Sequence, residues 1–265
     1  MRIGPGDPGP GPSDAWITLA GLARDTSTIR LGTLVSSATF RLPGPLAIAV
    51  ATVDAMSGGR VELGLGTGWY DGEHAAYGIP FPPTKDRFEI LDEQLAVITG
   101  LWGADGTFSF KGKHYELVDS PALPKPVQSP RPSIMLGGWG AKKTPALAAK
   151  YADEFNVPFP PPGVAPAMFG HLDAACEAAG RDPKSIVRSI ATVTCVGSDE
   201  AELQRRAAAI DKTVDELRSG ALGGTVDEVK ERAALFESEG AERLYLQILD
   251  LDDLDHLRLI ADALL

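Results

Sequence analysis

The residues best placed to do chemistry lie in a glycine-rich run that begins at Val61 and reads VELGLGTGWYDGEHAAYG. Its glycines would let the backbone come close to a flat ring or a phosphate, because no side chain intervenes. Glu73 and His74 follow and could exchange protons, since histidine titrates near neutral pH. Adjacent helical residues do not face each other, so they form no natural acid–base pair. A structural role for His74 is the alternative, as is a plain strand-end turn for the glycines.

A second glycine pair, Gly137 and Gly138, lies between a predicted strand and a predicted helix in the run MLGGWGAKKT. Exposed N–H groups and the positive end of the helix dipole favour an anion such as phosphate at that point. Lys142 and Lys143 add positive charge. An ordinary turn with solvated lysines is the alternative.

Small hydroxyl residues, Ser36 and Ser37, close a predicted strand at 29–37. At the carboxyl end of a strand such hydroxyls could form hydrogen bonds with the edge of a planar ligand. Both are also common turn residues, so this pattern alone does not distinguish the two roles.

The remaining reactive residue types lack the spacing of known catalytic centres. The four histidines have no metal-ligand spacing, which argues against a metal site. Cys176 and Cys195 are isolated, so neither a disulfide framework nor a zinc motif is indicated, and a reducing cytoplasm is the simplest setting. No Ser-His-Asp or nucleophilic cysteine arrangement can be assembled.

The composition is that of a globular protein of 265 residues, 44% hydrophobic and 23% charged. A net charge of −11 without a basic block argues against nucleic acid and anionic membrane partners. No apolar run approaches the roughly 20 residues of a bilayer span, and the N-terminus lacks a signal-peptide core. We therefore expect a cytoplasmic protein that acts on a small molecule.

Strands and helices alternate along the chain and must position these loops. The first fourteen residues are rich in proline and glycine and are expected to form an irregular loop. Strands are expected at 29–37, 61–66, 133–136, 154–157, 187–196 and 244–249, and a hairpin at 108–117 within an insertion at 103–132. Helices are expected at 16–23, 45–56, 84–102, 144–152, 164–179 and 254–265, one capped by Ser198 with its apolar face at 203–217, and one capped by Thr225.

This alternation predicts an α/β fold with parallel strands and right-handed crossovers. A closed barrel and an open doubly wound sheet both satisfy the pattern. No internal repeat or linker divides the sequence, so 1–265 is expected to be a single domain.

Several motifs occur in an order that resembles the bacterial luciferase-like monooxygenases, and most closely their F420-dependent oxidoreductase subgroup. They are SGGRVELGLGTGW at 57–69, EHAAYG at 73–78, DRFEILDE at 86–93, LW at 101–102, FKGKHY at 110–115 and RLYLQ at 243–247. The resemblance implies a TIM-type (β/α)8 barrel with the hairpin inserted between the fourth and fifth strands. It also implies the deazaflavin F420, or alternatively FMN, at the carboxyl face.

The resemblance also assigns the cofactor contacts by position. It places three residues at the border of the ring, three along the cofactor and three at its phosphate: Ser36, Ser37 and Ala38; Thr67, Gly68 and Trp69; Leu136, Gly137 and Gly138. It further implies a non-proline cis peptide at Leu34–Val35 or one bond later. Family members are often dimers, so a homodimer is expected.

The chain departs from the family at its start. The family opens with a strand, a helix and a second strand before the helix that here contains Trp16, and the proline-rich segment 5–12 cannot supply a barrel strand. The expected fold is therefore a barrel that is incomplete at the N-terminus, with about six parallel core strands plus the hairpin. Such a barrel would expose backbone edges at 29–37 and 244–249, and we expect a truncated member or a misplaced start.

The function that the resemblance implies is transfer of a hydride between the deazaflavin and a small organic substrate. An FMN-dependent monooxygenase that uses reduced flavin and oxygen is one alternative. A truncated, non-catalytic cofactor-binding remnant, or a subunit completed by a partner, is another. Glu73 and His74 are the candidate acid–base residues in either enzyme.

Overall fold

The computed structural model describes residues 13–265, so the predicted loop at 1–14 lies almost wholly outside the described residues. Asp14 begins the first helix, α1 (Ala15–Asp25), because its carboxylate accepts hydrogen bonds from the backbone N–H groups of Trp16 and Ile17, each at 3.0 Å. The chain divides after Met135 into two units, which are described one at a time. The expectation of a single domain stays a prediction.

Three short parallel strands carry the candidate loops of the first unit. β1 (Leu31–Gly32) and β2 (Ser36–Ser37) both pair with β3 (Val61–Gly66). The strand predicted at 29–37 is therefore interrupted. The carbonyl of Thr33 lies so close to Gly64 that a Cβ atom there would be 1.9 Å from its oxygen, and only glycine permits this approach. The Leu34–Val35 peptide between the two strands is cis, which confirms the bond expected from the resemblance.

The helices of the first unit pack around a core that begins with α2 (Pro43–Ser57). This helix starts at a proline, as its fixed φ angle favours, and ends at Gly58, whose φ of 70° is left-handed. Leu46 and Val50 are fully buried, which explains why α2 is apolar on most sides. α3 (Asp71–Ala76) is a short helix directly after the glycine-rich run.

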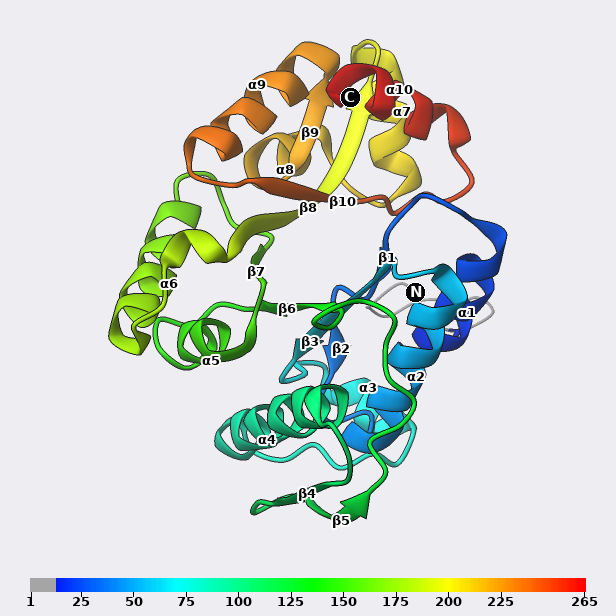
Figure 1. Ribbon diagram of the computed structural model, residues 1–265. Helices are drawn as coiled ribbons and strands as arrows, with labels where there is room; N and C mark the ends of the chain where they lie inside the picture. The colour runs from blue at the N-terminus through cyan, green and yellow to red at the C-terminus, as the bar shows by residue number, and fades with distance from the viewer. Residues whose placement is uncertain (1–12) are drawn as a thin grey trace. The chain divides into compact units, whose positions relative to one another are not determined.

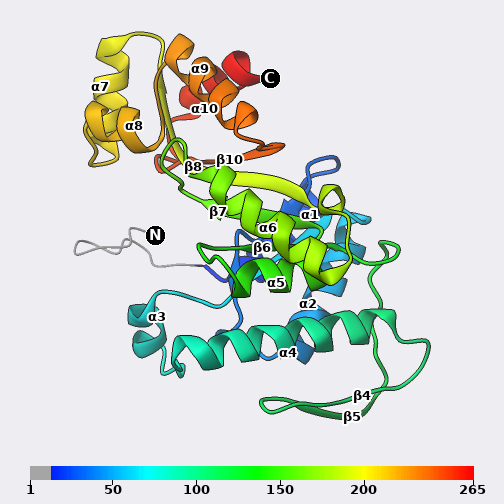
Figure 2. The same ribbon diagram turned by 90° about the vertical axis from the view of Figure 1, so that its left-hand side faces the viewer.

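An antiparallel hairpin lies beside the long helix α4 (Thr84–Gly103) in both views of the molecule (Figures 1 and 2). Its strands are β4 (Phe108–Lys111) and β5 (Glu116–Ser120), which confirms the predicted hairpin. Glu93 on α4 holds the turn, because its carboxylate accepts hydrogen bonds from three successive backbone N–H groups. These are the N–H groups of Lys113 at 2.7 Å, His114 at 2.9 Å and Tyr115 at 3.0 Å.

The second unit is built on longer parallel strands. β6 (Ser133–Gly137) is the strand in which the division between the units falls. β7 (Glu154–Pro158), β8 (Val187–Gly197) and β10 (Arg243–Gln247) then pair in the order β7-β8-β10. A further strand that was not predicted, β9 (Leu222–Thr225), pairs with the carboxyl end of β8.

Helices alternate with these strands. They are α5 (Lys143–Tyr151), α6 (Ala165–Ala179), α7 (Glu200–Ala209), α8 (Val214–Gly220), α9 (Val226–Ser238) and α10 (Leu254–Leu264), with a 3-10 turn, η1, at Pro183–Ser185. The capping box predicted at Thr225 and Glu228 is present at the start of α9.

Two predictions at the start of this helical region are wrong. Asp199, not Ser198, caps α7, since its carboxylate accepts from the N–H of Glu202 at 2.8 Å. The single helix expected from the apolar face at 203–217 is two helices. Thr213 starts α8 with a capping box of its own, and Leu203 of α7 and Leu217 of α8 pack into one apolar cluster.

Counting β1 and β2 as one interrupted strand and leaving aside β9, which lies beside β8 off the main path of the sheet, the described residues contain six core strands that alternate with helices, as expected. The fold class is α/β. No helix within 13–265 is both long enough and apolar enough to cross a membrane.

Candidate functional site

The carboxyl ends of β2 and β3 lie next to each other in the first unit, and this brings two groups of predicted cofactor residues together. Ser37 pairs with Gly66, and the N–H of Ala38 donates to the carbonyl of Gly66 at 2.8 Å. Two residues beyond Gly66, a Cβ atom on Gly68 would lie 2.3 Å from the Oγ of Ser37, and the φ of Gly68, 77°, is left-handed. Glycine is therefore required at position 68 by both space and backbone conformation.

Thr67 and Trp69 flank this glycine. The Oγ1 of Thr67 donates to the carbonyl of Gly68 at 3.4 Å. Trp69 is 72% exposed, and its ring centroid lies 5.5 Å from that of Tyr70. A large exposed aromatic side chain beside the loop leaves apolar surface on which a planar ligand could stack.

Arg87 supports the loop from the first turn of α4 and was not among the predicted site residues. Its Nη1 donates to the carbonyl of Gly68 at 2.9 Å, and its guanidinium lies 3.9 Å from the ring centroid of Phe81. The side chain is buried, although its Nε has no partner among the described residues. In the sequence, Arg87 is marked only by its place in the DRFEILDE motif at 86–93, which does not by itself indicate a role for the arginine.

His74 lies wholly inside the protein, with a partner on each ring nitrogen. Its Nε2 is 2.6 Å from the Oγ1 of Thr39, and its Nδ1 is 2.7 Å from the carbonyl oxygen of Tyr70. The ring centroid of Phe81 lies 4.5 Å away, and Glu73 comes no closer to Nδ1 than 3.8 Å. This placement favours the structural role, while acid–base chemistry by Glu73 and His74 stays a prediction.

An open cleft of about 460 Å³ lies between the start of α1 and the segment that links β1 to β2. Thr33, Leu34, Val35 and Ser36 line one side of it, and residues from Ser13 to Leu19 line the other. Its volume falls within the few hundred Å³ that ligand pockets occupy. Leu34 and Val35 are partly exposed, so polar hydroxyls and apolar side chains border the same cleft, as a planar heterocycle requires.

The predicted phosphate residues lie in the second unit, where β6 ends. Leu136 is buried, and Gly138 adopts a φ of 150° and donates its N–H to the carbonyl of Asn156 at 3.1 Å. A Cβ atom on Gly137 would lie 3.2 Å from that same carbonyl oxygen. α5 then starts without a side-chain cap at its N-terminus, which is compatible with an anion there.

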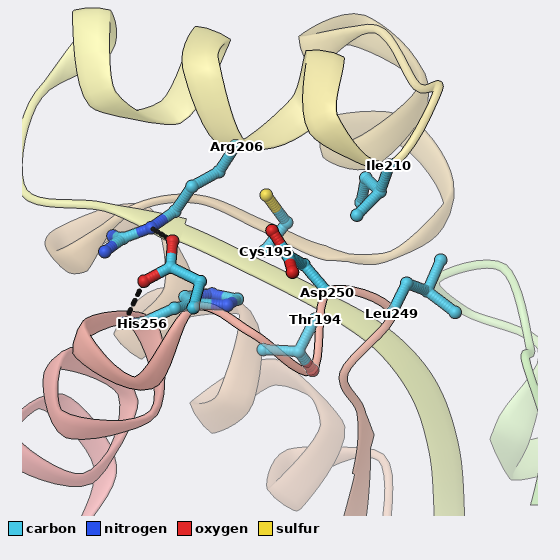
Figure 3. A pocket seen from close by; sticks show the side chains of 8 residues that line it. Thr194, Cys195, Arg206, Ile210, Leu249, Asp250 and His256 are labelled. Atoms are coloured by element: carbon cyan, nitrogen blue, oxygen red, sulfur yellow. Dashed lines mark hydrogen bonds and ion pairs between the residues drawn. The ribbon is translucent and has the colours of Figure 1, made fainter.

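The second unit contains a hollow that is polar but very small, lined by residues that include Thr194, Arg206 and His256 (Figure 3). The Nε2 of His256 on α10 accepts from the N–H of Val196 at 2.9 Å, and Arg206 on α7 donates to the carbonyl of Val196 at 2.8 Å. Arg206 also pairs with Asp253 at 2.9 Å. Burial, together with the charge of Arg206, lowers the pKa of His256. A volume of about 10 Å³ holds about one water molecule, so this hollow is not a ligand pocket.

Within 13–265 there is no group of three or more His, Cys, Asp or Glu side chains that could hold a metal ion.

Parallel strands that alternate with helices and carry candidate loops at their carboxyl ends place the chain in the class of α/β proteins. The chain belongs to the luciferase-like monooxygenase family, whose model matches residues 4–264. The structure of a coenzyme F420 dependent tetrahydromethanopterin reductase from Methanopyrus kandleri matches with a TM-score of 0.80 at 18% identity, over 95% of this chain and 86% of that one. The fold is therefore that of a luciferase-like TIM-type barrel with part of the barrel represented.

The curated relatives include proteins named for F420 and proteins named for reduced FMN. An F420-dependent glucose-6-phosphate dehydrogenase from Amycolatopsis mediterranei is 38% identical over 139 residues, which are 52% of this chain and 39% of that protein. An FMNH2-dependent dimethylsulfone monooxygenase from Pseudomonas putida is 34% identical over 117 residues, 42% of this chain and 32% of that protein. The chain thus spans well under half the length of each of these two relatives.

Proposed function

We propose that this chain is an F420-dependent oxidoreductase that transfers a hydride between the deazaflavin and a small organic substrate. The observation that carries the proposal is the cleft of about 460 Å³ bordered by Leu34, Val35 and Ser36, in a chain of the luciferase-like family. The 38% identical relative is named for F420, which favours the deazaflavin.

The residues present fit such a ring. The hydroxyl of Ser36 and the apolar side chains of Leu34 and Val35 border one cleft, which suits a heterocycle with an apolar face and a polar edge. Ser37 and Ala38 continue that border toward Thr67, Gly68 and Trp69.

Gly68 keeps the space above Ser37 free of a side chain, and Arg87 fixes the carbonyl of Gly68. In the second unit, Gly137, Gly138 and the uncapped start of α5 could receive an anion such as a phosphate.

The bound cofactor supplies the carbon that gives or takes the hydride. The protein's part is to orient the ring and to keep water away from the reacting face. A substrate would bind on the exposed side of the ring, where Trp69 offers apolar surface. Because His74 is enclosed, it could exchange a proton with the substrate only through the hydroxyls of Thr39 and Ser37.

Titration with oxidised F420 and with FMN, followed by absorbance and fluorescence, tests the proposal. We expect saturable F420 binding in the micromolar range with a shift in its visible band, and weaker binding of FMN. Reduced F420 should then be oxidised in the presence of a carbonyl substrate from a small panel. A protein that binds neither ring would refute both enzyme proposals.

A second candidate function is an FMN-dependent monooxygenase, which the FMNH2-dependent relative favours. Preferential binding of FMN and consumption of oxygen with reduced flavin would support it. Ring binding without turnover would instead support a non-catalytic cofactor-binding protein or a subunit completed by a partner. Light scattering at several protein concentrations tests the proposed homodimer.

A further inference from the structure

Ser36 begins a chain of hydrogen bonds whose direction is fixed by its last member. That member is the carbonyl oxygen of Gly64, which can only accept, so the hydroxyl of Thr33 donates to it at 2.8 Å. Thr33 has then used its proton and accepts from the hydroxyl of Ser36 at 3.2 Å. The indole N–H of Trp16 donates to Ser36 at 3.2 Å. Ser36 therefore keeps one lone pair and no proton for anything that approaches it.

Ser37 begins a second chain that leads in another direction and also ends at a carbonyl. The carbonyl oxygen of Tyr70 can only accept, so the Nδ1 of His74 must carry the proton that bridges their 2.7 Å separation. In a neutral imidazole the other nitrogen, Nε2, is then an acceptor, and it takes the hydroxyl proton of Thr39 across 2.6 Å.

The direction of the hydrogen bond between Ser37 and Thr39 follows from the bond that Thr39 donates to His74. Once the hydroxyl of Thr39 donates to His74, the 2.7 Å contact between Ser37 and Thr39 must be donated by Ser37. Ser37 is half-buried, and two lone pairs remain on its oxygen without a proton. The two neighbouring serines thus each donate their hydroxyl proton to a hydrogen bond that leads into the protein.

We propose that Ser36 and Ser37 act as obligate hydrogen-bond acceptors toward the bound ring and select a ligand edge that carries N–H or O–H donors. Thr33, Thr39 and His74 are the positioning residues that set this polarity. The inference rests on the proposed function, since it takes the occupant to be a deazaflavin or flavin ring. An edge of carbonyl oxygens against the same serines would meet only lone pairs and be repelled.

The chemistry of the ring makes the prediction specific. An oxidised flavin carries a single ring N–H, at N3, between two carbonyl groups, and the deazaflavin ring keeps that N–H. N3–H is thus the ring donor that both cofactors share, and we expect one of the two serines to accept it in the oxidised complex. Methylation of N3 removes this donor and leaves the rest of the ring in place.

The first test reads the polarity without any cofactor. Imidazole ¹⁵N shifts of the full chain report which ring nitrogen of His74 carries the proton, and the His74→Gln variant identifies the signals among the four histidines. We expect the proton on Nδ1 with Nε2 unprotonated. A proton on Nε2, or on both nitrogens, would reverse the Ser37 chain and overturn the proposal for that serine.

The second test couples each serine to the ring donor. Dissociation constants are measured for F420 and N3-methyl F420 with the wild type, Ser36→Ala and Ser37→Ala. Loss of one hydrogen bond of ordinary strength is expected to weaken wild-type binding roughly threefold to tenfold on methylation. Replacing the serine that contacts N3–H by alanine should weaken binding of F420 by a similar factor. That variant should then bind F420 and N3-methyl F420 equally well. Equal discrimination by the wild type and both variants overturns the serine–ring contact.

A matched pair at position 39 separates polarity from structure. Thr39→Ser keeps the hydroxyl and should keep the discrimination between the two ligands at Ser37. Thr39→Val fills the same space but frees the Ser37 proton, so discrimination by Ser37 should fall. Retained discrimination in Thr39→Val argues against the positioning role. If the wild type binds neither F420 nor FMN, the proposed function and the ring contact both fail, while the tautomer of His74 still decides the polarity by itself.

Discussion

Asp54 and Gln128 lie 74 residues apart in the sequence and are joined by two hydrogen bonds inside the first unit. The side-chain amide of Gln128 donates to Oδ1 of Asp54 at 2.7 Å, and its backbone N–H donates to Oδ2 at 3.1 Å. The N–H of Val127 adds a third bond at 2.8 Å. Because Asp54 is fully buried on α2, its carboxylate holds residues 127–128, near the end of the insertion at 103–132, against the core.

Replacing Asp54 should therefore destabilise the first unit. In Asp54→Ala three part-buried donors lose their buried acceptor, and we expect a loss of about 3 kcal/mol in the free energy of unfolding. Asp54→Asn keeps one acceptor oxygen in the same space and should lose less. Urea unfolding followed by tryptophan fluorescence measures both variants. Wild-type stability in Asp54→Ala would show that these bonds do not hold the insertion.

Gly68 and Gly163 form a matched pair for testing the candidate loop. Both have left-handed φ angles, 77° and 83°, but a Cβ atom would strike Ser37 only at position 68. Gly163→Ala should lower the free energy of unfolding by about 1–2 kcal/mol, because alanine disfavours the left-handed backbone conformation. Gly68→Ala should cost more and should abolish F420 binding because it displaces Ser37. Titration of both variants with F420 decides this, and unimpaired binding by Gly68→Ala would place the ring elsewhere.

The two cysteines should be unreactive in the folded protein. Both are buried, and burial raises the pKa of Cys195 to about 11 and that of Cys176 in the same direction. At pH 8 the thiolate is therefore scarce as well as shielded. A disulfide reagent should detect no thiol in the native chain and two after unfolding in urea. Ser219→Cys, at an exposed position, is the positive control, and rapid native reaction of either natural cysteine would contradict the burial.

His256 should make stability depend on pH below neutrality. Burial is the main cause of its lowered pKa, with Arg206 lowering it further, while Asp253, Asp250 and Glu202 oppose the shift. Since its folded pKa lies below the ordinary value of 6.5, the unfolded chain binds the proton more readily. The stabilising contribution is thus complete above about pH 6.5 and is lost as the pH falls through the folded pKa.

The His256→Gln variant measures this contribution. Glutamine can still accept the N–H of Val196 but does not titrate, so the fall in unfolding free energy between pH 7 and pH 5 should become shallower. An unchanged slope would mean that other groups cause the pH dependence.

The sequence was most informative where local patterns decide the structure. The strand at 61–66 has the bounds that its apolar run predicted, and the helix predicted at 84–102 differs from α4 by one residue. The hairpin and the capping box at Thr225 were also predicted correctly. Each depends on neighbours within a few positions, which a single sequence displays.

Apart from the helix cap, which was placed one residue early at Ser198, the errors came from contacts that neighbouring residues do not display. The strand at 29–37 is interrupted where the carbonyl of Thr33 meets Gly64, and the helix over 203–217 is interrupted because two segments share one apolar cluster. β9 is short and glycine-rich, so its pairing with β8 could not be recognised. Arg87 remained unassigned because its partner, the carbonyl of Gly68, lies 19 residues away.

Glu93 has a consequence for how the hairpin could be redesigned. The hairpin is anchored at its tip, through the backbone of Lys113, His114 and Tyr115, so the clasp does not depend on the side chains of the two strands. The strand residues other than Phe108, whose ring lies against Gly100 of α4, could be exchanged for foreign sequence while one carboxylate keeps the element in place. The hairpin is thus a ready attachment point for a grafted binding peptide, provided that Glu93 is left untouched.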